Sequence, residues 1–332
     1  MPSALSIAVV ATLLATAFQA SSAENPLPVA KFQGDVFNEM ARAFGCVVST
    51  DAVAHTLTLA LEKDGSVVTV PIRMDTELHV RDSWGELGDF FAGQRVMLFM
   101  YVDDERKWTW PRAVQDELHM TARHGYFDKV VAIEAEGHSY TTAHETKNPD
   151  GTKGKDLFKR YHYDPAVKVW KGATATGIES LAVGDEVIQQ QVLKDGVKVT
   201  VEIADRNGDK EIAALQDAKH HQDEDHLGLP CYVTDVDVLT GAVSFTVPWC
   251  SAARAKQLAP GAVTAVVPGD GSKAFAAALI ALQEVDQRER LQMVVNSRVA
   301  SRLAYGQALR LFVPGTGPAV PTGKVGVPES GK

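Results

Sequence analysis

The sequence predicts an all-β protein with minor helix, built from small β-barrel modules arranged in tandem along 332 residues. Hydrophobic residues make up 45% and charged residues 23% of the chain, which is typical of a folded globular protein. A glycine turn recurs four times, each time before a segment in which apolar and polar residues alternate as they do in a strand. Three pairs of alternating segments flank Asp-Gly or Thr-Gly, the turn chemistry that joins antiparallel strands.

The repeated turn has a leucine or a phenylalanine three residues before its glycine. Such self-similarity indicates a chain made of repeated units, each a few strands long. Upstream of three copies lies a second shared piece, which reads as strand, turn and strand and starts at Gly45, Gly125 or Gly228. The four turns lie at 90–93, 181–184, 258–261 and 303–306.

Three hairpins are predicted in a defined register, because the turn chemistry and the apolar pattern select the same pairing in each. Their two-residue turns are Asp64-Gly65, Asp195-Gly196 and Thr240-Gly241. The predicted cross-strand pairs are Leu61 with Val68, Val192 with Val199, and Val238 with Val243.

A module therefore reads as a hairpin, a third strand, a glycine turn and a second hairpin. Five short strands with a small helical insert before the fourth are the order of an OB-like barrel, and an SH3-like barrel has similar signals. In the first module the insert is predicted within 84–91. Short connecting helices are predicted within 111–122 and 209–220.

These signals divide the chain into three barrel modules and their flanking segments. Phe37, Met40, Ala41 and Phe44 fall at helical spacing after Asp35, a residue type suited to an N-cap, which predicts a helical lead-in. The end of the chain is rich in Gly and Pro, which predicts a flexible tail. The predicted segments are a lead-in at 24–44, modules at 45–124, 125–205 and 228–314, a polar connector at 206–227, a partial fourth repeat from about 273 and a tail at 315–332.

The strand–Asp-Gly–strand pieces and the repeated glycine turns carry a resemblance to a known class of proteins. The chain resembles the exported bacterial proteins built from tandem small β-barrel (OB-like) modules, most of which have no known function. The resemblance covers most of residues 45–313. It implies no catalytic residues, so none are assigned.

The first 23 residues contain no Asp, Glu, Lys or Arg, and they predict a signal peptide. A short apolar run at 5–18 precedes Ser21 and Ala23, the small residues that signal peptidase expects at its −3 and −1 positions. The alternative is a buried N-terminal helix. We therefore expect an exported protein of the periplasm or the extracellular space, with no transmembrane segment in the mature chain.

The charge balance argues against nucleic acid as a partner. Lys and Arg number 33 against 42 Asp and Glu, so the net charge is −9 and the sequence pI is about 5.6. The chain has no block of Lys and Arg, the usual electrostatic footprint of a nucleic-acid-binding protein.

Two basic–aromatic strands are the candidate ligand surface. Aromatic rings flanked by cationic donors suit sugars, and the faces of OB-like barrels bind oligosaccharides. The alternative is that the alternate aromatic residues close the barrel core while the basic residues face water. The candidate ligand-binding residues are Arg106, Trp108, Trp110, Arg160 and Tyr161.

A histidine- and carboxylate-rich segment supports an alternative function. Imidazole and carboxylate groups are ligands for divalent metals such as zinc, copper or nickel. The alternative, favoured by the position of the segment in a polar linker, is a solvated acidic connector. Its candidate metal ligands are His220, His221, Asp223, Asp225 and His226.

No catalytic motif is present: the sequence lacks a GxSxG elbow, an HExxH pair, a Walker loop and a Gly-rich dinucleotide turn. We therefore expect a non-enzymatic binding or scaffolding protein of the bacterial envelope without a cofactor, whose partner is an envelope polysaccharide or another envelope protein. The alternative is a metal-binding protein or metal-dependent enzyme that uses the 220–226 segment.

Three cysteines are present, and two of them are predicted to form a disulfide. The Thr240-Gly241 register sets Cys231 directly opposite Cys250, at a spacing that a disulfide can span. An exported protein meets an oxidising compartment in which such a bond persists. Cys46 is then left unpaired, and the alternative is three reduced thiols.

Overall fold

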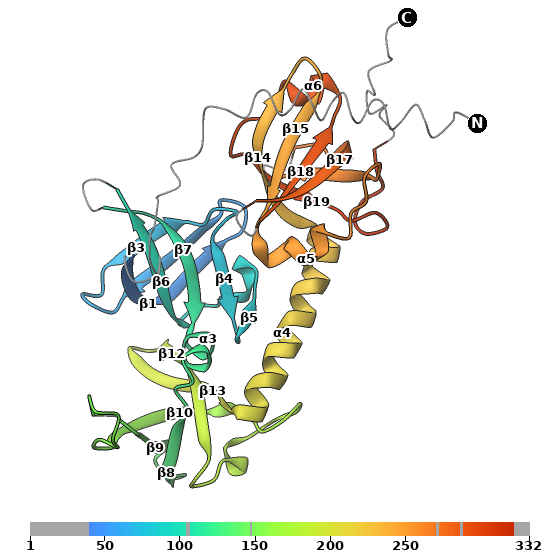
Figure 1. The fold of residues 1–332 in the computed structure, drawn as a ribbon. Coiled ribbons are helices and arrows are strands. Elements are labelled where there is room, and N and C mark those ends of the chain that lie inside the picture. Colours follow the sequence, from blue (N-terminus) through green and yellow to red (C-terminus); the bar gives the residue numbers. More distant parts are fainter. Residues whose placement is uncertain (1–39, 104–106, 147, 270–271, 286–287, 322–332) are drawn as a thin grey trace, which may run out of the picture.

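The computed structural model describes residues 40–103, 107–146, 148–269, 272–285 and 288–321. The predicted signal peptide at 1–23 and the end of the predicted tail lie outside these residues. Within them the chain forms three β-units in sequence, joined by two helices (Figure 1). The structure confirms an all-β protein with minor helix and tandem small barrels.

The first unit is a seven-stranded sheet. Its strands are β1 (Ala41–Asp51), β2 (Thr56–Leu61), β3 (Val67–Pro71), β4 (Glu77–Val80), β5 (Ser83–Trp84), β6 (Arg95–Val102) and β7 (Trp108–Asp116). They lie in the order β3-β2-β1-β6-β7-β4-β5, and all neighbours are antiparallel except β4 and β7. A single 3₁₀ turn, η1 (Leu87–Asp89), precedes β6 at the place of the predicted insert.

The second unit repeats this topology as a ring of five strands with one short edge strand. Its strands are β8 (Asp128–Glu134), β9 (Ser139–His144), β10 (Leu157–Trp170), β11 (Ala175–Thr176), β12 (Glu186–Lys194) and β13 (Val197–Asp205). The ring runs β8-β9-β10-β13-β12 and closes from β12 to β8, with β10 and β13 parallel. In the first unit β3 and β4 together take the place of β10. The shared strand order, with η2 (Ile178–Ser180) before the fourth strand, favours the OB-like alternative.

The third unit is a closed six-stranded barrel. Its strands are β14 (Leu229–Asp237), β15 (Ala242–Val247), β16 (Val263–Pro268), β17 (Phe275–Val285), β18 (Arg288–Val294) and β19 (Ala308–Leu311). They close in the order β14-β15-β18-β17-β16-β19, with short helices η3 (Trp249–Ser251), α5 (Ala252–Ala255) and α6 (Ser297–Ala300) at the connections. The chain after 273, where a partial fourth repeat is predicted within the third module, supplies strands that complete this barrel.

Two helices join the units. α3 (Glu117–Arg123) follows β7 directly, and α4 (Arg206–Leu227) runs from the second unit to the barrel, beside β4 and β5 (Figure 1). The predicted polar connector at 206–227 is therefore one regular helix. The Asp205 carboxylate caps it by accepting the N–H groups of Asn207 and Gly208, and it ends at Gly228 with φ +82°.

The first unit also contacts α4 and the barrel through polar groups. The Gln216 side chain on α4 donates to the carbonyl of Trp84 at 3.0 Å. Arg310 on β19 forms a two-point ion pair with Glu86, at 3.0 and 2.8 Å. The rings of Trp84 and Trp249 pack in a T-shaped arrangement, with ring centroids 4.8 Å apart. The three units are thus held in contact by specific polar pairs as well as by packing.

The predicted helical lead-in is wrong in its described part. Residues 41–44 begin β1, where Ala41 pairs with Met100 and Phe44 pairs with Met97 of β6. Sheet hydrogen bonds with a central strand override the local helical spacing. The remainder of the lead-in lies outside the described residues.

All four predicted glycine turns are confirmed. Their glycines have φ values that residues with a side chain adopt only at a cost, and each is followed by a strand. The values are +84° at Gly93, +102° at Gly184, +87° at Gly261 and +77° at Gly306.

The predicted register is right in one hairpin and shifted in two. Val192 pairs with Val199 across the Asp195-Gly196 turn as predicted, although a bulge at Gln190 and Gln191 shifts the rest of that hairpin. In the other two hairpins the loop has four residues, which moves each pairing by two positions. Val68 pairs with Leu59 instead of Leu61, and Val243 pairs with Val236 instead of Val238.

The predicted disulfide between Cys231 and Cys250 is wrong, and all three cysteines are free. A bulge between Val233 and Asp235 turns the start of β14, so that Cys231 points into the barrel core. Cys250 lies beyond the end of β15, in η3. Burial raises the pKa of both thiols to about 12, and Cys46 is also buried.

A backbone contact fixes the first unit on the second. The N–H of Leu193 donates to the carbonyl of Gly93 at 2.7 Å, and Gln94 forms an isolated β-bridge with Val192. A Cβ atom at Gly93 would lie 2.8 Å from the Leu193 carbonyl oxygen. The repeated turn at 90–93 thus has a second role in this copy, because it also joins two units.

We expect Gly93→Ala to lower the free energy of unfolding by about 2 to 3 kcal/mol, since it adds left-handed backbone strain and displaces the inter-unit hydrogen bond. Urea unfolding measures this. The matched control is Gly88→Ala in η1, where open space surrounds the new Cβ and the change should stay within about 0.5 kcal/mol. Equal effects of the two substitutions would contradict this role of Gly93.

Candidate functional site

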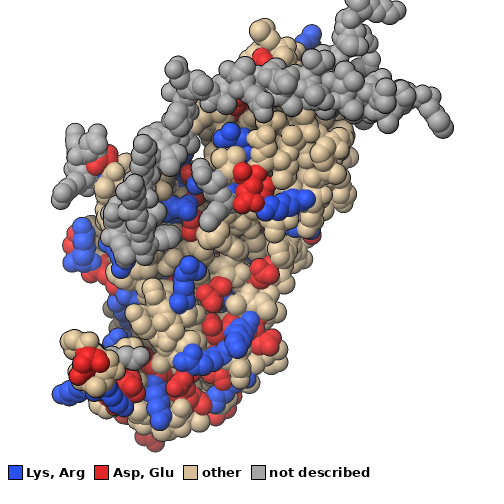
Figure 2. Space-filling view, in the orientation of Figure 1, with Lys and Arg blue, Asp and Glu red and all other residues tan. Residues whose placement is uncertain are grey.

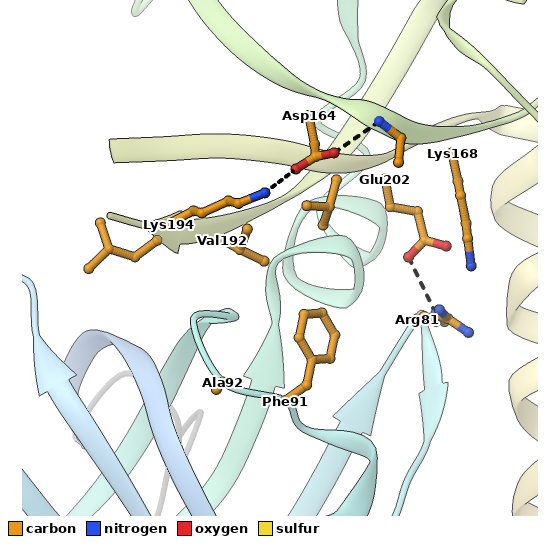
Figure 3. Close-up of a pocket in the computed structure, with 11 residues that line it drawn as sticks. Arg81, Phe91, Ala92, Asp164, Lys168, Val192, Lys194 and Glu202 are labelled. Carbon is orange, nitrogen blue, oxygen red and sulfur yellow. Dashed lines mark hydrogen bonds and ion pairs between the residues drawn. The ribbon is translucent and has the colours of Figure 1, made fainter. Parts of the chain in front are cut away.

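A cavity of about 520 Å³ lies between the first and second units (Figure 3). It opens beside the turn that joins them, so its shape depends on the contact between Gly93 and Leu193. Apolar and charged side chains both reach it. Its lining residues are Arg81, Phe91, Ala92, Asp164, Ala166, Lys168, Val192, Leu193, Lys194, Val201 and Glu202.

An aromatic ring and aliphatic side chains form the apolar part of the pocket. Phe91 comes from the repeated turn before β6, while Val192 comes from β12 and Val201 from β13. Phe91 is 46% exposed, whereas the preceding Phe90 is buried in the core of the first unit. The turn therefore directs its first aromatic residue inward and its second into the pocket.

The charged part contains three cations and two carboxylates. Lys194 pairs with Asp164 at 3.1 Å, and the Nε of Arg81 lies 3.4 Å from Glu202 (Figure 3). Lys168 on β10 is exposed and has no ion pair within the described part of the chain. The pocket thus carries one positive charge in excess, on a protein with a net charge of −9.

Arg81 is placed by an unusual turn. Arg81 and Asp82 both have positive φ, +52° and +58°, between β4 and β5. The N–H of Arg81 donates to the Asp116 carboxylate at 2.9 Å, which holds the turn. Its side chain reaches Glu202, whose other oxygen accepts from the Trp170 indole at 2.8 Å. Local strain of this kind persists where surrounding groups fix it, often at functional sites.

A buried carboxylate lies where the first two units meet. Glu117, the first residue of α3, accepts the N–H of Gln191 at 2.8 Å and pairs with Arg95 at 2.9 Å. Its own N–H donates to the Gln190 side chain at 3.1 Å. Burial raises the pKa of Glu117, and Arg95 opposes that rise. The group therefore ties α3, β6 and β12 together.

Several titratable groups meet where the Arg81 turn approaches α3 and α4. His119 lies 3.1 Å from Asp82 and stacks on His79, with ring centroids 4.2 Å apart. Burial raises the pKa of Asp116 to about 6, although two backbone N–H groups bond to it. Burial and the nearby Asp82 and Asp116 raise the pKa of Asp209 to about 6. One Asp209 oxygen is buried without a hydrogen-bond partner among the described residues.

The predicted tryptophans lie on β7, away from the pocket lining. Each ring is covered by a cation of this chain, since Lys63 lies 5.5 Å from the Trp108 ring and Arg73 lies 4.4 Å from the Trp110 ring. Arg106 lies outside the described residues. A sugar would have to displace these cations before it could stack on either ring.

Arg160 and Tyr161 lie on β10 in the second unit, so the structure does not bring them together with the tryptophans. Arg160 pairs with Glu134 and donates to the Ser139 hydroxyl at 3.0 Å. Tyr161 stacks on Tyr140 and packs against the core, and burial raises the pKa of Tyr161 to about 12. Tyr161 therefore acts mainly as a core residue.

The candidate metal ligands lie on α4, where they contact other side chains or a backbone carbonyl of this chain. His220 and the buried Glu224 are 3.5 Å apart, and His221 also contacts Glu224, at 3.1 Å. His226 contacts the Gln222 carbonyl at 2.7 Å. Within the residues that the structure describes, no group of three or more His, Cys, Asp or Glu side chains is placed to hold a metal ion. The two remaining candidates form ion pairs, Asp223 with Lys219 and Asp225 with Arg254.

Sequence reasoning missed the pocket residues, although one signal was available. At the position of Phe91 the other three copies of the turn have alanine, as Ala182, Ala259 and Ala304. An aromatic residue at a position that is otherwise alanine marks a copy with an added role. Arg81, Lys168 and Glu202 carry no comparable signal, because only the contact between units brings them together.

Charges on the visible face are mixed. Figure 2 shows Lys and Arg side chains interspersed with Asp and Glu, most densely over the second unit, and no single-sign stripe on this face. A basic stripe is the usual footprint of nucleic-acid binding.

We expect Asp209→Asn to raise the free energy of unfolding by about 2 kcal/mol at pH 7.5 and to change it little at pH 4. The pKa of Asp209 is raised in the folded state, so stability is lost as pH rises from about 4 to 6 and the carboxylate ionises. Urea unfolding at both pH values measures this, with the exposed Glu211→Gln on α4 as control. An equal gain at pH 4 would show that charge is not the cause.

Comparisons with known proteins identify no family. No family model matches the chain, and no curated protein matches it. A solved structure described as drosophila Unr CSD456 is similar over 62% of this chain and 78% of that chain, at 14% identity and a TM-score of 0.17. A likeness this weak carries no argument about ligand or partner. Among the described residues, no helix combines the length and apolar character needed to cross a membrane.

Proposed function

We propose that this chain is an exported, non-enzymatic binding protein of the bacterial envelope, and that it holds a glycan in the pocket between its first two units. The observation that carries the proposal is the pocket itself, which Phe91, Arg81 and Lys168 all line. Its volume of about 520 Å³ falls in the range of small-ligand sites.

The chemistry of the lining suits a saccharide. A sugar ring has an apolar face that packs on an aromatic side chain, and hydroxyl groups that need donors and acceptors around its edge. Phe91 offers the aromatic face, while Lys194, Asp164 and Glu202 offer polar groups around it. The proposed ligand is therefore still a glycan, as the sequence predicts, but the proposed site is the pocket instead of the strand β7 that carries Trp108 and Trp110.

The pocket carboxylates favour binding over catalysis. The Ala166 N–H and Lys194 hold the pKa of Asp164 below its usual range, so this group stays an ionised acceptor at neutral pH. Glu202 is held on both sides, by Trp170 and by Arg81. Neither carboxylate is paired with a nucleophile in the described structure, whereas acid–base catalysis needs a group free to exchange a proton.

The proposed export and location rest on the amino-terminal sequence. The uncharged first 23 residues, with Ser21 and Ala23 before Glu24, support a signal peptide. In the periplasm or outside the cell, the partner would be an envelope polysaccharide, and a second envelope protein is the partner for a scaffolding role. Stoichiometric metal in protein purified without a histidine tag would favour the metal-dependent alternative instead.

We expect Phe91→Ala to weaken glycan binding about tenfold, since it removes the aromatic face and costs on the order of 1.4 kcal/mol. Isothermal titration against a panel of soluble neutral and acidic glycans measures this. The control is Val183→Ala, an exposed residue in the corresponding turn of the second unit and outside the pocket. Failure of every glycan in the panel to bind the unaltered protein would contradict the proposal.

A further inference from the structure

We infer that the glycan bound in this pocket carries an acidic group, a carboxylate or a phosphate ester, and that Lys168 and Arg81 bind that group. The inference rests on the proposed function, because it specifies the chemistry of the same site.

Lys168 is the cation in excess. The other two pocket cations already face carboxylates, Lys194 with Asp164 and Arg81 with Glu202. Lys168 lies between the buried Val167 and Val169 on β10, so its side chain is on the opposite face of the strand from the core. Glu202 is the cross-strand neighbour of Lys168 on β13, but among the described residues no carboxylate lies within ion-pair distance of the Lys168 ammonium group. Such a group at a partly apolar pocket is suited to a carboxylate or phosphate from a ligand.

Arg81 has N–H donors that are available to a ligand. Its Nε faces Glu202, while its two terminal nitrogens have no ion pair or hydrogen bond with another described residue. A guanidinium group binds carboxylate or phosphate with two parallel N–H donors, a geometry that needs these terminal nitrogens. Glu202 can keep its contact with the Trp170 indole while Arg81 accepts a second anion.

The two cations lie at one end of the pocket. Figure 3 shows the ends of the Lys168 and Arg81 side chains at the same side of the pocket, next to the Glu202 carboxylate, while Phe91 enters the pocket from the first unit. An acidic sugar could therefore place its ring over Phe91 and its anionic group between the two cations. Glu202 opposes the anion, so the net attraction is that of one positive charge.

The test uses trigalacturonic acid and its fully methyl-esterified form, which have the same rings but differ in charge. We expect the acid to bind more tightly than the ester to the unaltered protein. Lys168→Gln should weaken binding of the acid about tenfold and leave the ester unchanged. Glu202→Gln, which keeps an acceptor for Trp170, should strengthen binding of the acid several-fold. Lys159→Gln, exposed on β10 outside the pocket, is the control and should change neither.

The outcomes separate the inference from the proposed function. Equal binding of acid and ester, with no effect of Lys168→Gln, would overturn the acidic-group inference and leave a neutral glycan site standing. Binding of glucose 6-phosphate but not of the trisaccharide acid would support the inference and identify phosphate as the group. Failure of both acidic probes, while neutral glycans bind, would overturn the inference alone. Failure of all glycans would overturn both.

Discussion

The buried carboxylate of Glu117 joins the first two units, and the candidate site depends on that junction. It accepts the N–H of Gln191 in the second unit and an N–H of Arg95 in the first, at 2.8 and 2.9 Å. A buried charge that loses a partner costs about 3 to 5 kcal/mol, so such a group strongly disfavours other arrangements of the units. With β12 fixed in this way, Leu193 meets Gly93 and the pocket takes its shape. The pocket is thus a product of inter-unit geometry rather than of either barrel alone.

Helix α4 also contacts the β-units through buried polar groups. Along its length the buried side chains are mostly polar, with Asp209, Gln216, His220 and Glu224 buried and Ile212 the apolar member. Buried polar groups contribute less to stability than apolar packing of the same area. However, few arrangements of the units give each of these groups a hydrogen-bond partner. Polar interfaces between domains otherwise tend to permit relative motion. Here the ion pair between Glu86 and Arg310 further restrains the first unit relative to the barrel.

The fold could be predicted from local sequence signals, whereas features that depend on long-range contacts could not. Glycine turns and the Asp195-Gly196 hairpin were predictable, because backbone sterics at positive φ leave few residues that fit. The disulfide was wrong because one bulge near Val233 rotated Cys231 into the core, and no local pattern marks a bulge. The pocket was not predictable, since Arg81 and Lys168 are 87 residues apart and meet only when two units pack. Phe91 alone could have been found, by comparing the copies of the turn.

The turn at Arg81 connects the contact between the first two units to the pocket. Its two positive-φ residues cost on the order of 1 to 3 kcal/mol each, so the surrounding contacts must hold them. Asp116 holds the backbone from the first unit, and Glu202 holds the side chain from the second. Asp116 is also the N-cap of α3, through its bond to the His119 N–H at 2.8 Å. The same carboxylate therefore starts the helix that carries Glu117 and holds the turn that carries Arg81, so the contact between the units and the candidate site cannot be altered independently at this point.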